Sequence, residues 1–289
     1  MHRVRQIAAL AALIGVFCGS HGFAAVEKAK ATAEKAKVTK LQIEGSTTVG
    51  PIAEAFSEAF MRVHKDARIT VKKTGSGDGA AALIDGRCDI ATMSRFMKAK
   101  EFKKAVEKEI MPVAHVVAMD GVCVIVHPSN PIGMLTTEQV RKIYKGELTN
   151  WSQVGGADRA IVAISRDTSS GTFETFHKLV MNKEKMASAV ETVGSNPQAH
   201  ARVKTTPGAI GYVGLGFVDR DVKALKVDGV TPSRKTIRSG QYPVARPLFM
   251  FTNGYPKLGS MTHAFVTFHL SEKGQEIVEA KGFVPVTEY

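Results

Sequence analysis

Cysteine is scarce in this 289-residue sequence, and long apolar segments are absent after the N-terminal region. Of the three cysteines, Cys18 lies in that region, which leaves Cys88 and Cys123 for the rest of the chain. Two cysteines permit a disulfide in an exported protein, but buried free thiols fit their apolar surroundings equally well. Neither has neighbours at metal-ligand spacing, so the sequence predicts no metal site. No later stretch is apolar for long enough to predict a transmembrane helix.

The sequence also lacks the local motifs of common hydrolases and nucleotide-using enzymes. It contains no G-x-S-x-G nucleophile elbow, no Walker A loop and no H-E-x-x-H motif. A Ser170–His177 pair would lie two helical turns apart, beyond hydrogen-bond reach. Gly75, Gly77 and Ala80 fit a dinucleotide fingerprint, but the helix that follows is too short for that unit. The sequence therefore predicts a protein that is not an enzyme and uses no cofactor.

The N-terminal region has the three parts of a secretory signal peptide. Arg3 and Arg5 precede an apolar run over residues 7–17, and a small-residue cleavage zone follows up to Ala25. We expect residues 1–25 to be removed on export, which places the mature protein in the periplasm or outside the cell.

A basic segment follows the signal peptide. Residues 26–40, VEKAKATAEKAKVTK, have no apolar face to bury and predict a flexible tether. The whole chain is also basic, with a formal net charge of +12 and a pI of about 9.6. This charge is a weak indication of binding to acidic surfaces, and no motif predicts a nucleic-acid partner.

From residue 41 onward the chain alternates strand and helix patterns. Apolar runs at residues 41–43, 68–71 and 160–165 predict strands, and each leads through a polar loop towards a helical pattern. A long strand is predicted over residues 115–128, broken at Asp120–Gly121. Further segments predicted in the same way are strands at 88–92 and 245–253 and helices at 51–64, 80–86, 136–144, 261–270 and 273–282. This alternation predicts an α/β fold with mostly parallel sheets.

Three of the polar loops combine glycine with serine and threonine, at residues 45–50, 74–79 and 166–172. The start of a helix has free backbone N–H groups and a partial positive charge. Glycine lets a ligand approach the backbone, and hydroxyls add donors. Helix capping explains any one of these loops. Three of them, with the planar guanidinium of Arg166 in one, predict an oxyanion site that needs no metal.

Several motifs extend this pattern along residues 41–289: GSTTVGP, GSGDG, MSR, DGVCVIVHPSNP, LTTEQVRKIYKGELTNWSQVGG, RDTSSGTFETF and PGAIGYV. In this order they resemble the periplasmic phosphate-binding proteins that serve phosphate ABC importers. The run R-x-x-x-S-G-T followed by PGAIGY is the most specific part of the resemblance. It implies a two-lobed, type II periplasmic binding protein, monomeric, that captures inorganic phosphate in a cleft and delivers it to an ABC permease.

The resemblance also implies a division into lobes and a set of ligand-binding residues. Residues 41–121 with 246–289 would form one lobe and residues 122–245 the other, with hinges at Asp120–Gly121 and Ala245–Arg246. The implied phosphate-binding residues are Ser46, Thr47, Thr48, Ser76, Gly77, Ser94, Arg95, Arg166, Ser170, Gly171 and Thr172.

One position departs from the family pattern. Many members have an aspartate after the serine of the third strand, where it accepts the proton of hydrogen phosphate, but here Ser94 is followed by Arg95. Arg95 either joins the site as a second cation or points away, and Asp78 is a hypothetical substitute acceptor. Molybdate, tungstate or sulfate therefore stay open as alternative cargoes. A secreted phosphate-ester hydrolase and an adhesion or signalling module are the alternatives from other classes.

Overall fold

The computed structural model describes residues 38–287 of the chain. The predicted signal peptide and residues 26–37 of the predicted tether lie outside this range. The first strand, β1 (Thr39–Gly45), includes residues 39 and 40, which the tether prediction had counted as flexible. None of the helices within the described range combines the length and the apolar character that crossing a membrane requires.

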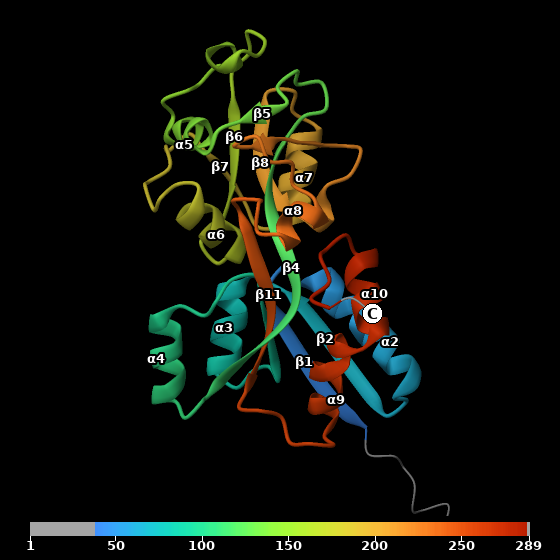
Figure 1. Ribbon diagram of the computed structural model, residues 1–289. Coiled ribbons are helices and arrows are strands. Elements are labelled where there is room, and N and C mark those ends of the chain that lie inside the picture. Colours follow the sequence, from blue (N-terminus) through green and yellow to red (C-terminus); the bar gives the residue numbers. More distant parts are fainter. Residues whose placement is uncertain (1–37, 288–289) are drawn as a thin grey trace, which may run out of the picture. The chain divides into compact units, whose positions relative to one another are not determined.

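The first lobe, in the lower half of Figure 1, is built on three parallel strands. The central strand β1 pairs with β2 (Ala67–Lys73) on one side and with β3 (Ile90–Met93) on the other. The helices that follow these strands are α2 (Gly50–Val63), α3 (Ser76–Ile84) and α4 (Ala99–Glu107). Helix α2 has a proline in its first turn and buries Ile52, Phe56 and Phe60, as their spacing predicted.

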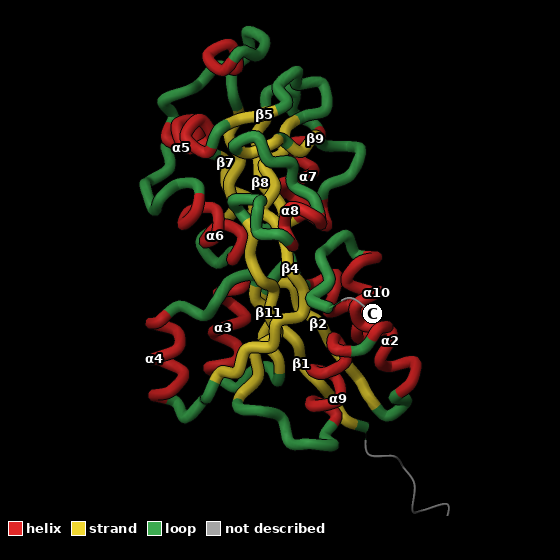
Figure 2. The backbone as a smooth tube through the Cα atoms, viewed as in Figure 1, coloured by secondary structure: helices red, strands yellow, loops and turns green. Residues whose placement is uncertain are grey.

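Two long antiparallel strands, β4 (Pro112–Val126) and β11 (Ala245–Asn253), run through the middle of the molecule (Figures 1 and 2). Strand β11 pairs with β3 of the first lobe, and β4 pairs with β8 of the second. The predicted break in β4 at Asp120–Gly121 is wrong. Both residues keep their places in the ladder, because Asp120 lies opposite Arg246 and Gly121 opposite Ala245.

The second lobe continues the sheet beyond β4 through β8 (Ala209–Gly214), β6 (Val162–Arg166) and β7 (Glu191–Val193). Its helices are α5 (Thr137–Lys145), α6 (Gly171–Leu179), α7 (Asn196–Lys204) and α8 (Arg234–Arg238). Short strands β5 (Met134–Leu135) and β10 (Lys226–Val227) pair with each other, and β9 (Lys223–Ala224) pairs with β4. Single 3-10 turns are η1 (Trp151–Val154) and η2 (Leu215–Phe217).

The C-terminal part of the chain returns to the first lobe. Helix α9 (Met261–Thr267), the 3-10 turn η3 (Phe268–Leu270) and α10 (Glu272–Ala280) lie beside α2 in Figure 1. Phe265 and Val278 from these helices share a buried apolar cluster with Phe56 and Phe60 of α2.

Each lobe has its own apolar core. Ala118 on β4 and Leu248 on β11 belong to the core of the first lobe. Val122 on β4 and Val244, just before β11, belong to the core of the second. The chain therefore passes between the two cores within a few residues of the Asp120–Arg246 pair.

The α/β fold class is confirmed, and two details of the prediction are corrected. Strands are parallel within each lobe, but the pairs that involve β4 and β11 are antiparallel. Helix α3 begins at Ser76, inside a segment predicted as a loop, because the positive φ of Gly75 turns the chain directly into the helix. The sequence patterns missed the elements β5, β7, α7, β9, β10 and α8.

Candidate anion-binding site

Four helices begin where the two lobes meet, as the hydrogen bonds between their first turns and preceding loops show: α2 and α3 from the first lobe, α6 and α7 from the second. Each N-terminus has backbone N–H groups without intrahelical acceptors and a partial positive charge. The first turns of α2 and α7 contain no acidic residue that would offset this charge. The convergence therefore favours an anionic ligand.

The hydroxyl-bearing loop before α2 is buried and faces the second lobe. Ser46 Oγ accepts hydrogen bonds from the amides of Thr48 and Val49, at 3.1 and 3.3 Å, which fixes the loop. Thr48 Oγ1 lies 2.9 Å from Thr172 Oγ1, at the start of α6. The structure thus brings together residues from the first and third predicted loops, which lie more than a hundred positions apart in the sequence.

The start of α6 is shaped by the Ser170–Gly171–Thr172 turn. Ser170 Oγ accepts the amide N–H of Phe173 at 3.2 Å and so caps the helix. The amides of Gly171 and Thr172 belong to the first turn, which has no acceptors within the helix. All three residues of the turn are buried. They present backbone donors and one further hydroxyl to the boundary between the lobes.

The second predicted loop meets the same turn. Ser76 Oγ accepts the amide of Ser94 at 3.0 Å and lies 3.3 Å from Ser94 Oγ. The amide of Gly77 donates to Ser169 O at 2.8 Å, so this backbone group already has a partner in the other lobe. The predicted donors from three loops and the third strand therefore form one buried group, which we call the cradle: Ser46, Thr47, Thr48, Ser76, Ser94, Arg166, Ser170, Gly171 and Thr172.

Gly171 has no space for a side chain in this closed arrangement. An ideal Cβ at this position would lie 2.4 Å from Ser76 Oγ and 2.6 Å from Ser94 Oγ, both in the opposite lobe. We expect Gly171→Ala to leave each lobe folded but to hold them apart, which weakens anion binding by about ten- to a hundredfold. Calorimetric titration measures the loss. Gly133→Ala, where no atom lies within 4 Å of the added Cβ, is the matched control, and equal affinities of the two variants would contradict the expectation.

Arg166 is the buried cation of the cradle, with 2% of its surface exposed. Its Nε donates to Val193 O at 3.2 Å, and its Nη2 donates to Gly194 O at 2.8 Å and to Thr47 Oγ1 at 3.3 Å. Its Nη1 is buried and has no hydrogen-bond partner among the described residues. Burial lowers the pKa of this guanidinium to about 10. A bound anion would balance this buried charge and accept the hydrogen bond that Nη1 leaves unmade.

Arg95 has a carboxylate partner of its own. Its Nη1 and Nη2 donate to the two carboxylate oxygens of Glu101 at 2.8 and 2.7 Å, and Nη1 also donates to Phe96 O at 2.9 Å. Glu101 is held in place because it accepts the amide of Lys98 at the start of α4. Within residues 38–287 the hydrogen bonds of Arg95 go to these groups and to none of the cradle hydroxyls.

A buried ion pair that the sequence patterns missed lies beside the cradle. Arg246 donates from Nε and Nη2 to Asp120 Oδ2, at 3.0 and 2.7 Å, and the two side chains are 4% and 0% exposed. Burial raises the pKa of Asp120, although the adjacent guanidinium opposes this shift. The Nη2 group of Arg246 also donates to Thr172 Oγ1 at 3.0 Å. The signal available in the sequence was a lone Asp inside an otherwise apolar strand.

Asn196 is a further residue that the sequence patterns missed. It is fully buried at the start of α7, and its Nδ2 donates to Thr47 Oγ1 and Thr48 Oγ1 at 3.2 and 2.9 Å. Helix α7 was not predicted, because its polar residues outnumber the few apolar ones and show no helical periodicity. Without the helix, no pattern placed this amide near the cradle.

Several other side chains lie outside the cradle. Cys88 and Cys123 are free and buried, which settles the open question of a disulfide, and burial raises the pKa of Cys88 to about 12. His177 stacks on Phe173, one turn away on α6. No group of three potential metal ligands occurs in the described part of the chain. The hypothetical proton acceptor Asp78 is half-buried, and its carboxylate lies near Gly75.

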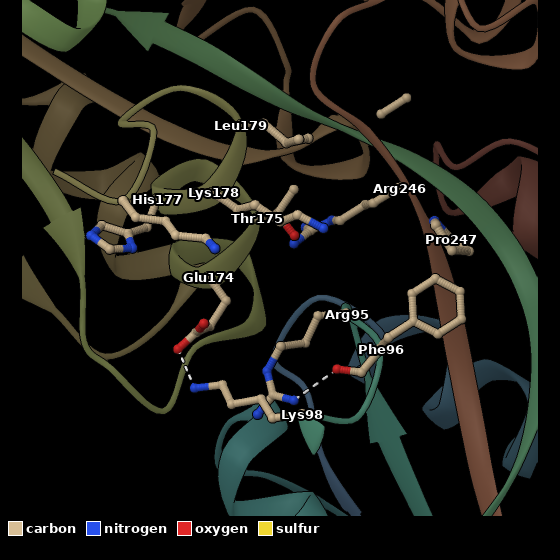
Figure 3. A pocket seen from close by; sticks show the side chains of 12 residues that line it. Arg95, Phe96, Lys98, Glu174, Thr175, His177, Lys178, Leu179, Arg246 and Pro247 are labelled. Carbon is tan, nitrogen blue, oxygen red and sulfur yellow. Dashed lines mark hydrogen bonds and ion pairs between the residues drawn. The ribbon is translucent and has the colours of Figure 1, made fainter. Parts of the chain in front are cut away.

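A cavity of about 490 Å³ lies next to the cradle (Figure 3). Arg95, Phe96 and Lys98 of the first lobe line one side, and Glu174, Thr175 and Lys178 of α6 line the other. Lys98 and Glu174 form an ion pair across it, drawn as a dashed line in Figure 3. Arg246 reaches from this cavity to the cradle hydroxyls.

Comparison with known proteins relates this arrangement to a family. A family model described as the PBP superfamily domain matches residues 30–273. The phosphate-binding protein PstS of Bacillus subtilis (strain 168) is 31% identical over 283 residues, which cover 96% of this chain and 91% of that protein. PstS of Staphylococcus haemolyticus is 33% identical over 257 residues, which cover 85% of this chain and 80% of the relative.

Solved structures show the same relationship. A substrate-binding protein of Clostridium perfringens, assigned to phosphate ABC transport and solved with bound phosphate, has a TM-score of 0.80 and 33% identity, and covers 86% of this chain and 100% of that one. An ABC-type phosphate transport receptor of Vibrio cholerae has a TM-score of 0.70 and 30% identity, and covers 84% of this chain and 99% of that one. The predicted two-lobed type II fold is thereby confirmed, and the chain belongs to the PBP superfamily and, within it, to the family of PstS phosphate-binding proteins.

Proposed function

We propose that this chain captures inorganic phosphate between its two lobes and delivers it to an ABC importer. The observation that carries the proposal is the buried Arg166, whose Nη1 has no acceptor among the described residues and whose Nη2 donates to the cradle hydroxyl of Thr47. Burial of an uncompensated cation is unfavourable unless a ligand supplies the counter-charge. The names of the relatives, and the phosphate bound in the Clostridium perfringens structure, support phosphate as that ligand.

In this proposal the cradle residues hold the anion through charge-assisted hydrogen bonds rather than through one ion pair. Arg166 supplies the positive charge, and the hydroxyls and first-turn amides supply directed donors. Gly77 contributes close packing, since its amide already has a partner in the other lobe. Arg95 would act at the edge of the site, with its charge partly balanced by Glu101.

We further propose that residues 41–121 with 246–289 move as one lobe and residues 122–245 as the other. The separate cores and the two strand crossings near Asp120 and Arg246 support these boundaries. Because cradle donors come from both lobes, phosphate would bind each lobe and favour their closed arrangement. The periplasmic location, the permease partner and the monomeric state are parts of the same proposal.

The ion pair between Lys98 and Glu174 joins the two lobes in this closed form. We expect Glu174→Gln to weaken phosphate binding by no more than about fivefold, because partly exposed pairs contribute about 1 kcal/mol or less. The effect should shrink as salt is added. Titrations at low and high ionic strength measure it, with Glu276→Gln on α10 as a control that breaks an ion pair within one helix. A loss that does not depend on salt would contradict this role.

Competition experiments separate the proposed function from its alternatives. Sulfate and molybdate should fail to displace bound phosphate at equal concentration, and a chromogenic phosphate ester should be neither bound tightly nor hydrolysed. Displacement by sulfate or molybdate would keep the fold and change the cargo. Turnover of the ester would support a hydrolase instead, although no nucleophile–base pair lies in the cradle as described.

A further inference from the structure

Asn196 uses every hydrogen-bonding group of its side chain. Its Oδ1 accepts the amide N–H of Gly214 at 3.2 Å, which requires the Nδ2 group to face Thr47 and Thr48. The orientation of the amide is therefore set by its partners and is not an arbitrary assignment. An NH₂ group can only donate, so both threonine hydroxyls must accept from it.

Thr47 receives a second donor on the same oxygen. Arg166 Nη2 donates to Thr47 Oγ1 at 3.3 Å, in addition to Asn196 Nδ2 at 3.2 Å. A hydroxyl has two lone pairs and one hydrogen. Because both lone pairs accept bonds, the hydrogen of Thr47 must point to a third group. Within the described structure this oxygen lies beside Arg166, whose Nη1 is also unpaired.

Thr48 and Thr172 can be counted in the same way, as a pair. Thr48 Oγ1 accepts from Asn196 at 2.9 Å and lies 2.9 Å from Thr172 Oγ1, and either hydroxyl of the pair can be the donor. Thr172 Oγ1 accepts from Arg246 Nη2 at 3.0 Å, and the other hydrogen of that nitrogen goes to Asp120 Oδ2. The pair has two hydroxyl hydrogens and uses one of them between its members, so one is left for a further acceptor.

We propose that Asn196 is a positioning residue that orients the Thr47 hydroxyl, and one hydroxyl of the Thr48–Thr172 pair, as donors to the bound anion, with Arg246 completing the array. This inference rests on the proposed function. Both hydroxyls then require a lone pair on an anion oxygen as the acceptor. Because Asn196 belongs to the second lobe and Thr47 and Thr48 to the first, the hydroxyls are oriented only when the lobes are together. Closure of the lobes and orientation of the hydroxyl donors therefore occur together.

The test compares Asn196→Ala, Thr47→Val and the double variant in titrations of ligand-free protein with inorganic phosphate. Asn196→Ala should weaken binding by about three- to tenfold, because the Thr47 hydroxyl becomes free to rotate. If Asn196 acts through that hydroxyl, its replacement should cost clearly less in the Thr47→Val background. Additive losses, or wild-type affinity of Asn196→Ala, would overturn the inference.

Asn196→Asp provides a second test, because its phosphate affinity should depend on pH in a way that would not occur if Asn196 only filled space. The introduced carboxylate accepts from the threonine hydroxyls and turns their hydrogens away from the anion, so the loss should exceed that of Asn196→Ala. The ratio of variant to wild-type affinity should recover as the pH falls from about 8 to about 5, because a buried carboxyl regains a proton in this range and donates again. A ratio that stays constant with pH would count against the inference.

Ser195→Ala controls for helix stability. Ser195 Oγ caps the same helix by accepting the amide of Gln198 at 3.2 Å, and makes no hydrogen bond to the cradle hydroxyls within the described residues. Thermal unfolding should show a lower Tm for this variant, whereas its phosphate affinity should equal that of the wild type. If the wild type itself binds no phosphate, the proposed function fails. If the wild type binds and Asn196→Ala binds equally well, the inference alone fails.

Discussion

Arg166→Ala is expected to weaken phosphate binding by about 100- to 1,000-fold, because the variant loses the buried charge and at least one charge-assisted hydrogen bond. The phosphate affinity of Arg166→Lys should lie between those of the wild type and Arg166→Ala. Lysine keeps a charge, but it cannot reproduce the planar guanidinium, whose other donors bond to the carbonyls of Val193 and Gly194. Calorimetric titration of ligand-free protein measures both losses.

Although Arg166→Ala should greatly weaken phosphate binding, it should not destabilise the ligand-free protein to a similar degree. Burial lowers the pKa of Arg166 to about 10, so the folded protein disfavours the charged form when no anion balances it. Removing that charge relieves a desolvation cost while it abolishes tight binding. We therefore expect an unchanged or higher Tm without phosphate, and a much smaller rise in Tm when phosphate is added.

Arg62→Ala is the matched control, because it removes an exposed arginine from the far end of α2. That helix has 14 residues, which places Arg62 roughly 20 Å from the cradle. Its phosphate affinity should equal that of the wild type within about twofold. Similar affinities for the Arg62 and Arg166 variants would show that net charge, not the cradle, determines binding.

Asp120→Asn is expected to lower the free energy of unfolding by about 3–5 kcal/mol. The substitution keeps the shape of the side chain and an oxygen that can accept the amide of Leu215. It removes the negative charge opposite Arg246, which is 4% exposed and cannot be hydrated without local opening. The unpaired guanidinium lies where both chain crossings occur, so the cost should appear as a loss of global stability.

Denaturant unfolding measures this loss, with Asp221→Asn as the control. Asp221 pairs with Lys204 at 2.8 Å on the surface, and breaking that pair should cost less than about 1 kcal/mol. Replacing both partners by apolar residues, Asp120→Leu with Arg246→Met, should recover much of the stability lost in Asp120→Asn. Equal effects of Asp120→Asn and Asp221→Asn would contradict the structural role of the buried pair.

The cradle could be predicted to a large extent because its signals are local. Glycine, serine and threonine at the junction of a strand and a helix have few structural uses, and capping and anion binding are the main ones. The start of α6 illustrates this, since Ser170 caps the helix and Thr172 faces the other lobe. The sequence supplied the donors, and the resemblance supplied their grouping.

Contacts between distant segments could not be predicted in the same way. The pairing of Asp120 with Arg246 depends on the register of two strands more than a hundred residues apart, and an isolated Asp in an apolar run was taken for a break. Asn196 was missed because α7 lacks an apolar stripe. The pairing of Arg95 with Glu101 depends on where α4 begins, which no pattern in the sequence specified.

We infer that inorganic phosphate completes the cradle. The most direct test of this inference is calorimetric titration of refolded, ligand-free mature protein with phosphate, because protein purified without refolding can retain ligand. We expect tight binding of one phosphate per chain, lost in Arg166→Ala and retained in Arg62→Ala. Absence of phosphate binding by the correctly refolded wild type would contradict it.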